Sequence, residues 1–354
     1  MLFLSGTEHD LWVNLAHDIR SHEIDVESVL KKIRPNIRAA FCFYIGVLLT
    51  TDGERVRGEQ WLTAGTIREE DGLFSNAFLL GFLKRQGGNL VIPAPAFEDP
   101  RYFVHFVSVP MMQRARARFL DHFSHSLPVF DHPIRLMDIG CGDGSLTAGM
   151  LTRLLSSCKV PGVAEVLLVD PSRAMLDLAE KTVRSAHPDI PIRTDHTRIQ
   201  DLTDHMNIRF DIAVSSLAYH HMPYEEKERH LTRLKSWINH FILFEMDANN
   251  DLPEGESPEL SLSVYQSYGR IIDFIFSHDA EVEIAVSCVD RFLMSELVSL
   301  LTEKRGVRTD YHMLRTEWHR LFKDVLGPEF TLRCDSDAYA DEYMGLFTLH
   351  YGRE

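Results

Sequence analysis

Long apolar runs, paired cysteines and a surplus of basic residues are all missing from this sequence. The longest apolar runs, such as Phe41–Leu49, are too short to cross a bilayer. No basic stretch precedes an apolar core at the N-terminus, as a signal peptide would require. The five cysteines are scattered and include no CxxC pair, which is typical of reduced thiols and does not support a zinc site. We therefore expect a cytoplasmic protein with no membrane partner and no bound metal.

Acidic residues outnumber basic ones, with a formal net charge of −15 and a sequence pI of about 5.6. A nucleic-acid-binding protein normally has a concentrated basic face. The one basic cluster is Arg114, Arg116 and Arg118, and its spacing spreads the charges around a helix, which indicates a solvated helix surface. We expect a small-molecule substrate and no nucleic-acid partner, and we leave a homodimer open.

The first third of the chain, residues 1–128, is expected to be mostly helical. Apolar residues recur at helical spacing from Leu11 to Ile19 and from Phe74 to Leu83, and a long helix is expected over 111–123. A short extended piece is expected at 90–92, between turn residues, and is expected to pair with 103–107. We interpret this region as a cap that binds substrate or mediates dimerisation.

From residue 134 onward, short apolar runs alternate with helical segments. Predicted strands end near Asp138 and Asp170, and two more follow at 210–214 and 241–244. Such alternation predicts an α/β domain with a doubly wound parallel sheet, here residues 129–354. A mostly helical insertion at about 250–328 follows the fifth strand, and two strand-like pieces, 330–333 and 345–349, close the chain.

Three glycines lie between the first predicted strand of this domain and the helix after it. Gly140, Gly142 and Gly144 give the spacing GxGxG, which suits a tight turn against an adenosine-containing cofactor. A dinucleotide fingerprint would place its third glycine at position 145, where this chain has Ser145. Asp138, at the strand end, adds a carboxylate beside the loop.

The segment from Asp138 to Ser145 resembles the first motif of the class I S-adenosylmethionine-dependent methyltransferases, and the resemblance extends over about residues 111–250. It implies a seven-stranded, Rossmann-like sheet of the methyltransferase type, whose sixth and seventh strands are antiparallel. It also implies S-adenosylmethionine as the cofactor. The residues expected to bind that cofactor are Asp138, Gly140, Gly142, Asp170, Pro171, Ile199, Gln200 and Ser216.

Two of these residues have a physical rationale of their own. Asp138 can orient the loop and meet the cationic amino group of the methionine moiety. Asp170 ends a run of Val and Leu, and a buried strand seldom ends in an acid that has no partner, so a contact with the ribose hydroxyls is expected. The alternative for Asp170 is a helix cap, because Pro171 and a helix follow it.

Tyr219, His220 and His221 follow the fourth strand at the edge where ligands of open α/β sheets bind. A histidine there can take a proton from the acceptor or merely shape the pocket, and Tyr219 could face the sulfonium. The substrate candidates are Glu245, Tyr265 and Tyr268, although ordinary packing or solvation explains each of them as well.

The function predicted from these residues is methyl transfer from S-adenosylmethionine to an oxygen or nitrogen atom of a small metabolite. One alternative keeps the ligand but attacks its aminocarboxypropyl group and releases methylthioadenosine, as azetidine-2-carboxylate or nicotianamine synthases do. Another is a catalytically idle protein that binds S-adenosylmethionine and partners another protein.

Overall fold

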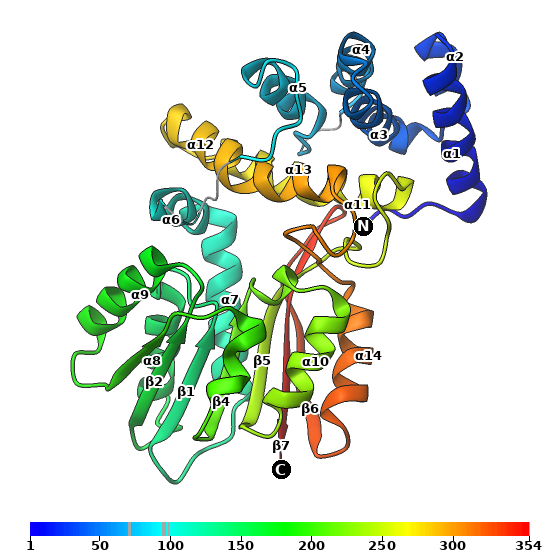
Figure 1. Cartoon of the computed structure of the whole chain (residues 1–354). Coiled ribbons are helices and arrows are strands. Elements are labelled where there is room, and N and C mark those ends of the chain that lie inside the picture. Colours follow the sequence, from blue (N-terminus) through cyan, green and yellow to red (C-terminus); the bar gives the residue numbers. More distant parts are fainter. Residues whose placement is uncertain (70–71, 94–96, 98, 354) are drawn as a thin grey trace. The chain divides into compact units, whose positions relative to one another are not determined.

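The chain forms two compact units, seen here in a computed structural model that describes residues 1–69, 72–93, 97 and 99–353 (Figure 1). The first unit comprises Met1–Pro95, Ala248–Asp310 and Asp341–Met344. The second comprises Ala96–Asp247, Tyr311–Ala340 and Gly345–Glu354. The chain therefore leaves the second unit after its fifth strand and returns to it before its sixth.

The second unit is built on a seven-stranded sheet with the order β3-β2-β1-β4-β5-β7-β6. Strands β1 to β5 are parallel, whereas β7 runs antiparallel to both β5 and β6. This arrangement confirms the predicted doubly wound sheet and its antiparallel closing pair. The strands are β1 (Ile134–Ile139), β2 (Val163–Val169), β3 (Ile192–Asp195), β4 (Phe210–Ser216), β5 (Ile238–Asp247), β6 (Phe330–Ala340) and β7 (Gly345–Arg353).

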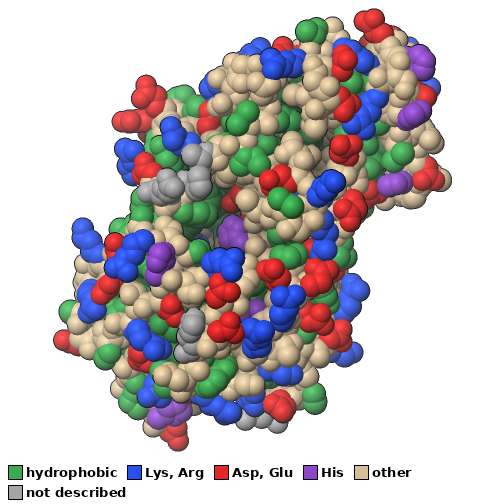
Figure 2. All heavy atoms as spheres, in the orientation of Figure 1, with side chains coloured by type: hydrophobic (Ala, Val, Ile, Leu, Met, Phe, Trp, Pro, Cys, Tyr) green, Lys and Arg blue, Asp and Glu red, His purple; other side chains and the backbone are tan. Residues whose placement is uncertain are grey.

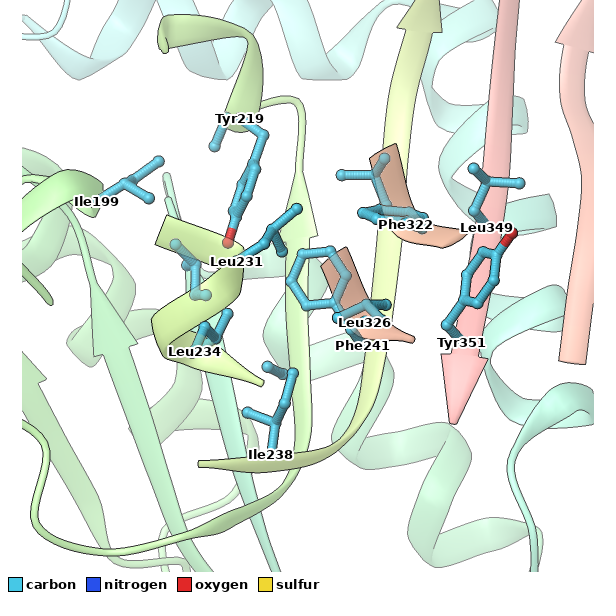
Figure 3. Close-up of a cluster of buried hydrophobic side chains, with 14 of the residues drawn as sticks. Ile199, Tyr219, Leu231, Leu234, Ile238, Phe241, Phe322, Leu326, Leu349 and Tyr351 are labelled. Atoms are coloured by element: carbon cyan, nitrogen blue, oxygen red, sulfur yellow. The ribbon is translucent and has the colours of Figure 1, made fainter. Parts of the chain in front are cut away.

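Helices cover this sheet and bury its apolar side chains. They are α6 (Pro100–Ser108), α7 (Pro110–Ser126), α8 (Ser145–Ser156), α9 (Arg173–Ala186), α10 (Tyr224–Leu234) and α14 (Arg315–Leu326), with 3-10 turns η3 (Ile199–His205) and η4 (Tyr219–His221). Figure 3 shows part of the resulting core, in which Leu231 of α10 and Phe322 of α14 lie with Phe241 of β5 and Tyr351 of β7. The parallel strands have continuous apolar runs in their sequences because both of their faces are buried.

The prediction of an extended piece over 103–107 is wrong, because those residues lie within helix α6. The helix begins where Pro100 fixes a helical φ at its first position and the Asp99 side chain accepts the N–H of Arg101. Its proposed partner, 90–92, forms no strand in the described part of the chain. Helices α6 and α7 belong to the sheet unit, although the sequence assigned them to the N-terminal region.

The first unit is helical. Its helices are α1 (Gly6–Ser21), α2 (Val26–Leu30), η1 (Pro35–Ile37), α3 (Arg38–Thr51), α4 (Arg55–Thr66), α5 (Asn76–Arg85), α11 (Pro258–Phe276), α12 (Val282–Cys288), the π-turn η5 (Val289–Leu293) and α13 (Met294–Thr302). Helix α3 is apolar on all sides and almost wholly buried, as expected of a central helix. None of the described helices has the length and hydrophobicity that a membrane span requires.

The insertion after β5 is helical, as predicted, but its helices divide between the units. Helices α11 to α13 belong to the first unit and α14 belongs to the second. On the face drawn in Figure 2, acidic and basic side chains are intermixed on the surface of each unit.

Candidate cofactor site

The glycine loop connects β1 to α8 and has left-handed backbone at all three predicted glycines, with φ of +77° at Gly140, +55° at Gly142 and +73° at Gly144. A Cβ on Gly140 would lie 2.3 Å from the Cβ of Ala218, and one on Gly144 would lie 2.7 Å from the Cα of Ala179. Glycine is required here for its conformation and for close approach to the neighbouring backbone. The loop therefore presents bare backbone at the carboxyl end of β1.

Asp138, the next-to-last residue of β1, is the buried acid beside this loop, with only 1% of its surface exposed. Its Oδ2 accepts a hydrogen bond of 2.5 Å from the Thr147 hydroxyl. Its Oδ1 is buried and has no hydrogen-bond partner among the described residues. Burial raises the pKa of Asp138 to about 6, although the nearby Arg116 opposes that rise. The site thus has an unsatisfied acceptor that suits a cationic donor.

Arg116 of α7 is a site residue that the sequence analysis missed. Its side chain is only 15% exposed, and its Nη2 donates to the Ser145 hydroxyl at 2.7 Å. The same nitrogen lies 3.9 Å from Oδ1 of Asp143 in the glycine loop, and burial lowers the pKa of Arg116. The prediction of a solvated surface is therefore wrong for Arg116. Its spacing, four residues after Met112 and three before Phe119 on the apolar face of α7, is the signal that could have found it.

Asp170 follows β2 and joins two loops at the carboxyl edge of the sheet. Its Oδ2 accepts the backbone N–H of Gly142 at 3.1 Å, and its Oδ1 accepts the N–H of Ser172 at 2.8 Å. The cap of α9 is Ser172, whose hydroxyl accepts the N–H of Met175. The helix-cap alternative therefore applies to Ser172, while Asp170 fixes the glycine loop. Burial raises the pKa of Asp170, against the effect of its two backbone donors.

The other predicted cofactor residues lie at or after the carboxyl ends of the strands. Ile199 is buried in the core of the second unit (Figure 3), and the amide of Gln200 donates to Glu226 at 3.1 Å. Ser216 is the half-buried last residue of β4, and Pro171 is exposed beside Asp170. No contact shown here joins these four side chains to Asp138, so their role in binding stays a prediction.

Tyr219, the first catalytic candidate, lies in the core. Its side chain is fully buried, its hydroxyl is 2.7 Å from Nδ1 of His230, and its ring packs on Phe241 (Figure 3). The buried Tyr219 side chain therefore fixes η4 to the core of the second unit. The geometry does not favour the predicted contact between Tyr219 and the sulfonium.

Glu245 of β5 anchors the turn that carries the histidines. Its Oε1 accepts the backbone N–H groups of Ala218, Tyr219 and His220 at 3.1, 3.1 and 3.3 Å, and its Oε2 lies 3.0 Å from Nδ1 of His220. Burial opposes ionisation of Glu245, but His220 and His312 outweigh it and hold its pKa well below the ordinary value. Glu245 therefore positions this turn, and its predicted contact with a substrate stays a prediction that its burial does not favour.

His220 is buried, and burial together with the neighbouring His312 lowers its pKa to about 4. The neutral ring therefore donates its Nδ1–H to the ionised Glu245. His221 is only partly buried, and its ring lies 6.2 Å from that of Phe97. His221 is close enough to Asp170 for a charge on its ring to lower the pKa of that carboxyl group.

Residues around α6 cover the glycine loop within the same unit. The Phe103 ring lies 3.0 Å from the position of a Cβ on Gly142, and the carbonyl of Phe97 accepts the Ser172 hydroxyl at 2.8 Å. The Phe103 ring thus packs against the glycine loop, and it belongs to the segment 103–107 that was predicted as a strand.

The two predicted substrate tyrosines are packed inside the first unit. The Tyr265 ring lies 5.6 Å from that of Phe43, and the Tyr268 hydroxyl donates to Glu296 at 3.0 Å. Both are almost fully buried on α11. Their contact with a substrate stays a prediction that this packing does not favour.

Comparison with known proteins agrees with the fold. Residues 136–240 match the family model described as the methyltransferase domain. No curated protein matches the chain. Among solved structures, SCL7 from Oryza sativa superposes with a TM-score of 0.58 at 14% identity, over 82% of this chain and 93% of that chain, which shows a shared fold.

Two further solved structures have lower TM-scores. Magnesium protoporphyrin IX methyltransferase (ChlM) from Synechocystis PCC 6803, with bound SAM, is 13% identical over 71% of this chain and 91% of that chain, with a TM-score of 0.41. The cyclopropane synthase MmaA2 from Mycobacterium tuberculosis is 12% identical over 74% and 97%, with a TM-score of 0.45.

The second unit therefore has the class I methyltransferase fold, which its sheet order and glycine loop define. Within it, residues 136–240 match the model of a methyltransferase domain, in agreement with the family that the glycine motif resembles.

Proposed function

We propose that the protein is an S-adenosylmethionine-dependent methyltransferase that acts on an oxygen or nitrogen atom of a small molecule. The observation that carries this proposal is the buried Oδ1 of Asp138, which has no partner among the described residues and lies beside a glycine loop of bare backbone. A buried carboxylate oxygen without a donor is costly, and the ammonium group of a methionine moiety would satisfy it.

The remaining parts of the cofactor have matching groups in the same unit. A carboxylate has about four acceptor positions, and the backbone donors of Gly142 and Ser172 use two of those on Asp170. Two positions are left for the ribose hydroxyls. Arg116, whose guanidinium has five donors and lies near the loop, would bind the methionine carboxylate.

His221 is the histidine placed to act on the acceptor. It is partly exposed on the side of Asp170, whereas Glu245 holds His220 in a buried position. A neutral imidazole can accept the proton of a hydroxyl or amine as the methyl group is transferred. Alignment of the acceptor with the sulfonium supplies the rest of the rate enhancement.

The chemistry is tested by incubating the protein with S-adenosylmethionine and a metabolite extract and identifying the nucleoside product. Methyl transfer yields S-adenosylhomocysteine in step with a methylated acceptor. Methylthioadenosine as the only enzymatic product would instead establish attack on the aminocarboxypropyl group. Binding without any product would favour the idle binding protein.

The role of His221 is tested by His221→Ala in a single-turnover assay. A general base contributes about 10²–10⁴-fold to the rate, so turnover should fall by that factor while cofactor affinity is retained. A fall of less than tenfold would limit His221 to shaping the pocket.

A further inference from the structure

Phe97 contacts both ends of the candidate cofactor site. Its carbonyl accepts the Ser172 hydroxyl at 2.8 Å, and its ring lies 6.2 Å from that of His221, at an angle of 87°. Ser172 in turn donates its backbone N–H to Oδ1 of Asp170. Phe97 therefore connects the loop after β2 to the turn after β4, and all of these residues belong to the second unit.

The covalent structure of S-adenosylmethionine determines which of its atoms would lie between these two ends. Its sulfonium sulfur is joined to the ribose by a single methylene carbon, and the methyl group on that sulfur must point at the acceptor. With Asp170 on the ribose and His221 at the acceptor, the sulfonium lies between them. These two side chains are close enough for a charge on His221 to lower the pKa of Asp170. A ring that contacts this stretch from both sides is therefore next to the sulfonium.

The aromatic side chains at this edge of the sheet can be reached by a ligand. Phe97, Phe103 and His221 are each only partly buried, whereas Tyr219 is fully buried in the core. The Phe103 ring packs on Gly142 and lies 6.2 Å from the ring of Phe97. The two phenylalanine rings give the site an apolar side, and a cation with less water around it gains more from an aromatic face.

We propose that Phe97 faces the sulfonium of S-adenosylmethionine and binds it through a cation–π contact. The negative face of an aromatic ring attracts a cation. A phenylalanine ring has no hydroxyl or amine that could accept the methyl group, so it can hold the cation without being methylated. S-adenosylhomocysteine lacks the positive charge on sulfur, so the contact favours the substrate over the demethylated product. This inference rests on the proposed function, because it takes S-adenosylmethionine as the ligand of the site.

The test measures the dissociation constants of S-adenosylmethionine and S-adenosylhomocysteine by calorimetric titration at pH 8, with no acceptor present. Leucine keeps an apolar side chain but has no aromatic face, so Phe97→Leu should weaken S-adenosylmethionine relative to S-adenosylhomocysteine by about 2- to 30-fold. Phe97→Tyr keeps the aromatic face and should keep the wild-type ratio. Phe103→Leu is the matched control, because it removes a ring that packs on Gly142 and should change both affinities by the same factor.

An unchanged ratio in Phe97→Leu would overturn the proposal, and so would an equal fall of the ratio in Phe103→Leu. The melting temperatures of the ligand-free variants show whether each one folds. Where Phe97→Leu does not fold, Phe97→Trp serves as the test, because tryptophan is the better cation–π partner and should raise the ratio; a ratio that it leaves unchanged would refute the contact. Wild type that binds neither ligand would overturn the proposed function as well, whereas normal wild-type binding with an unchanged ratio in Phe97→Leu overturns only the role of Phe97.

Discussion

Replacing Asp138 with Asn removes one buried charge and keeps the shape of the side chain. Burial raises the pKa of Asp138 from 3.8 to about 6. A raised carboxyl pKa means that the stability contributed by this group is fully present below pH 3.8 and is lost as the pH rises through about 6. A rise of roughly two pKa units corresponds to about 3 kcal/mol at pH 8. The ligand-free Asp138→Asn protein should therefore be more stable than wild type at pH 8, by up to that amount.

Cofactor binding should depend on the charge of Asp138 in the opposite sense, since the charge that lowers the stability of the ligand-free protein is needed to bind the cofactor. An ammonium group beside Asp138 favours the ionised carboxylate, so binding requires the deprotonated form. Below pH 6 the affinity of the wild type for S-adenosylmethionine should fall by about tenfold per pH unit. The loss of a charged hydrogen bond costs about 1.5–3 kcal/mol, so at pH 8 Asp138→Asn should bind roughly 10- to 150-fold more weakly.

The assay combines urea unfolding of the ligand-free proteins with titration calorimetry between pH 5 and 8. Asp143→Asn is the matched control, because it keeps an oxygen that can accept from Ser145 but removes the charge that lies 3.9 Å from Arg116, and this loss should destabilise the loop. The reasoning is refuted if Asp138→Asn destabilises the protein at pH 8 as this control does. It is also refuted if the variant binds S-adenosylmethionine as tightly as wild type.

Three further predictions follow from the contacts in the second unit. Asp170→Ala should weaken cofactor binding by about 10- to 150-fold. It should also lower the urea midpoint, because the N–H of Gly142 loses its acceptor. An unchanged affinity in the folded variant would exclude the ribose contact. Glu245→Ala should destabilise the fold by at least about 3 kcal/mol, because three buried backbone N–H groups lose their acceptor. Glu245→Gln, which keeps an acceptor oxygen, should recover part of that loss, and equal midpoints for all three proteins would contradict the anchoring role. Burial lowers the pKa of His350 to about 3. The stability that the neutral His350 contributes is therefore present above pH 6.5 and is lost as the pH falls towards 3. His350→Gln should make the melting temperature less sensitive to acid over that range, and an unchanged pH profile would refute this.

The sheet and the glycine loop could be predicted because their signals are local. The apolar run before Asp170 and the three glycines after β1 lie within short continuous segments. Asp138 and Asp170 were identified for the same reason, since each ends a buried strand.

The environment of the candidate catalytic residues could not be predicted, because it depends on distant parts of the chain. Glu245 contacts the N–H groups of a turn 25 to 27 residues before it. Arg116 meets Ser145, which is 29 residues later in the sequence. Tyr219 is buried because β5 and α14 pack around it, and no pattern near position 219 predicts that burial.

Binding of S-adenosylmethionine to the second unit is measured by calorimetric titration of the wild-type protein at pH 8. We expect binding to one site per chain, and ligand at 100 times its dissociation constant should add about 2.7 kcal/mol to the free energy of unfolding. S-adenosylhomocysteine, which keeps the ammonium group, the carboxylate and the ribose, should bind the same site. A folded protein that shows no heat of binding and no rise in melting temperature at millimolar S-adenosylmethionine would contradict the account.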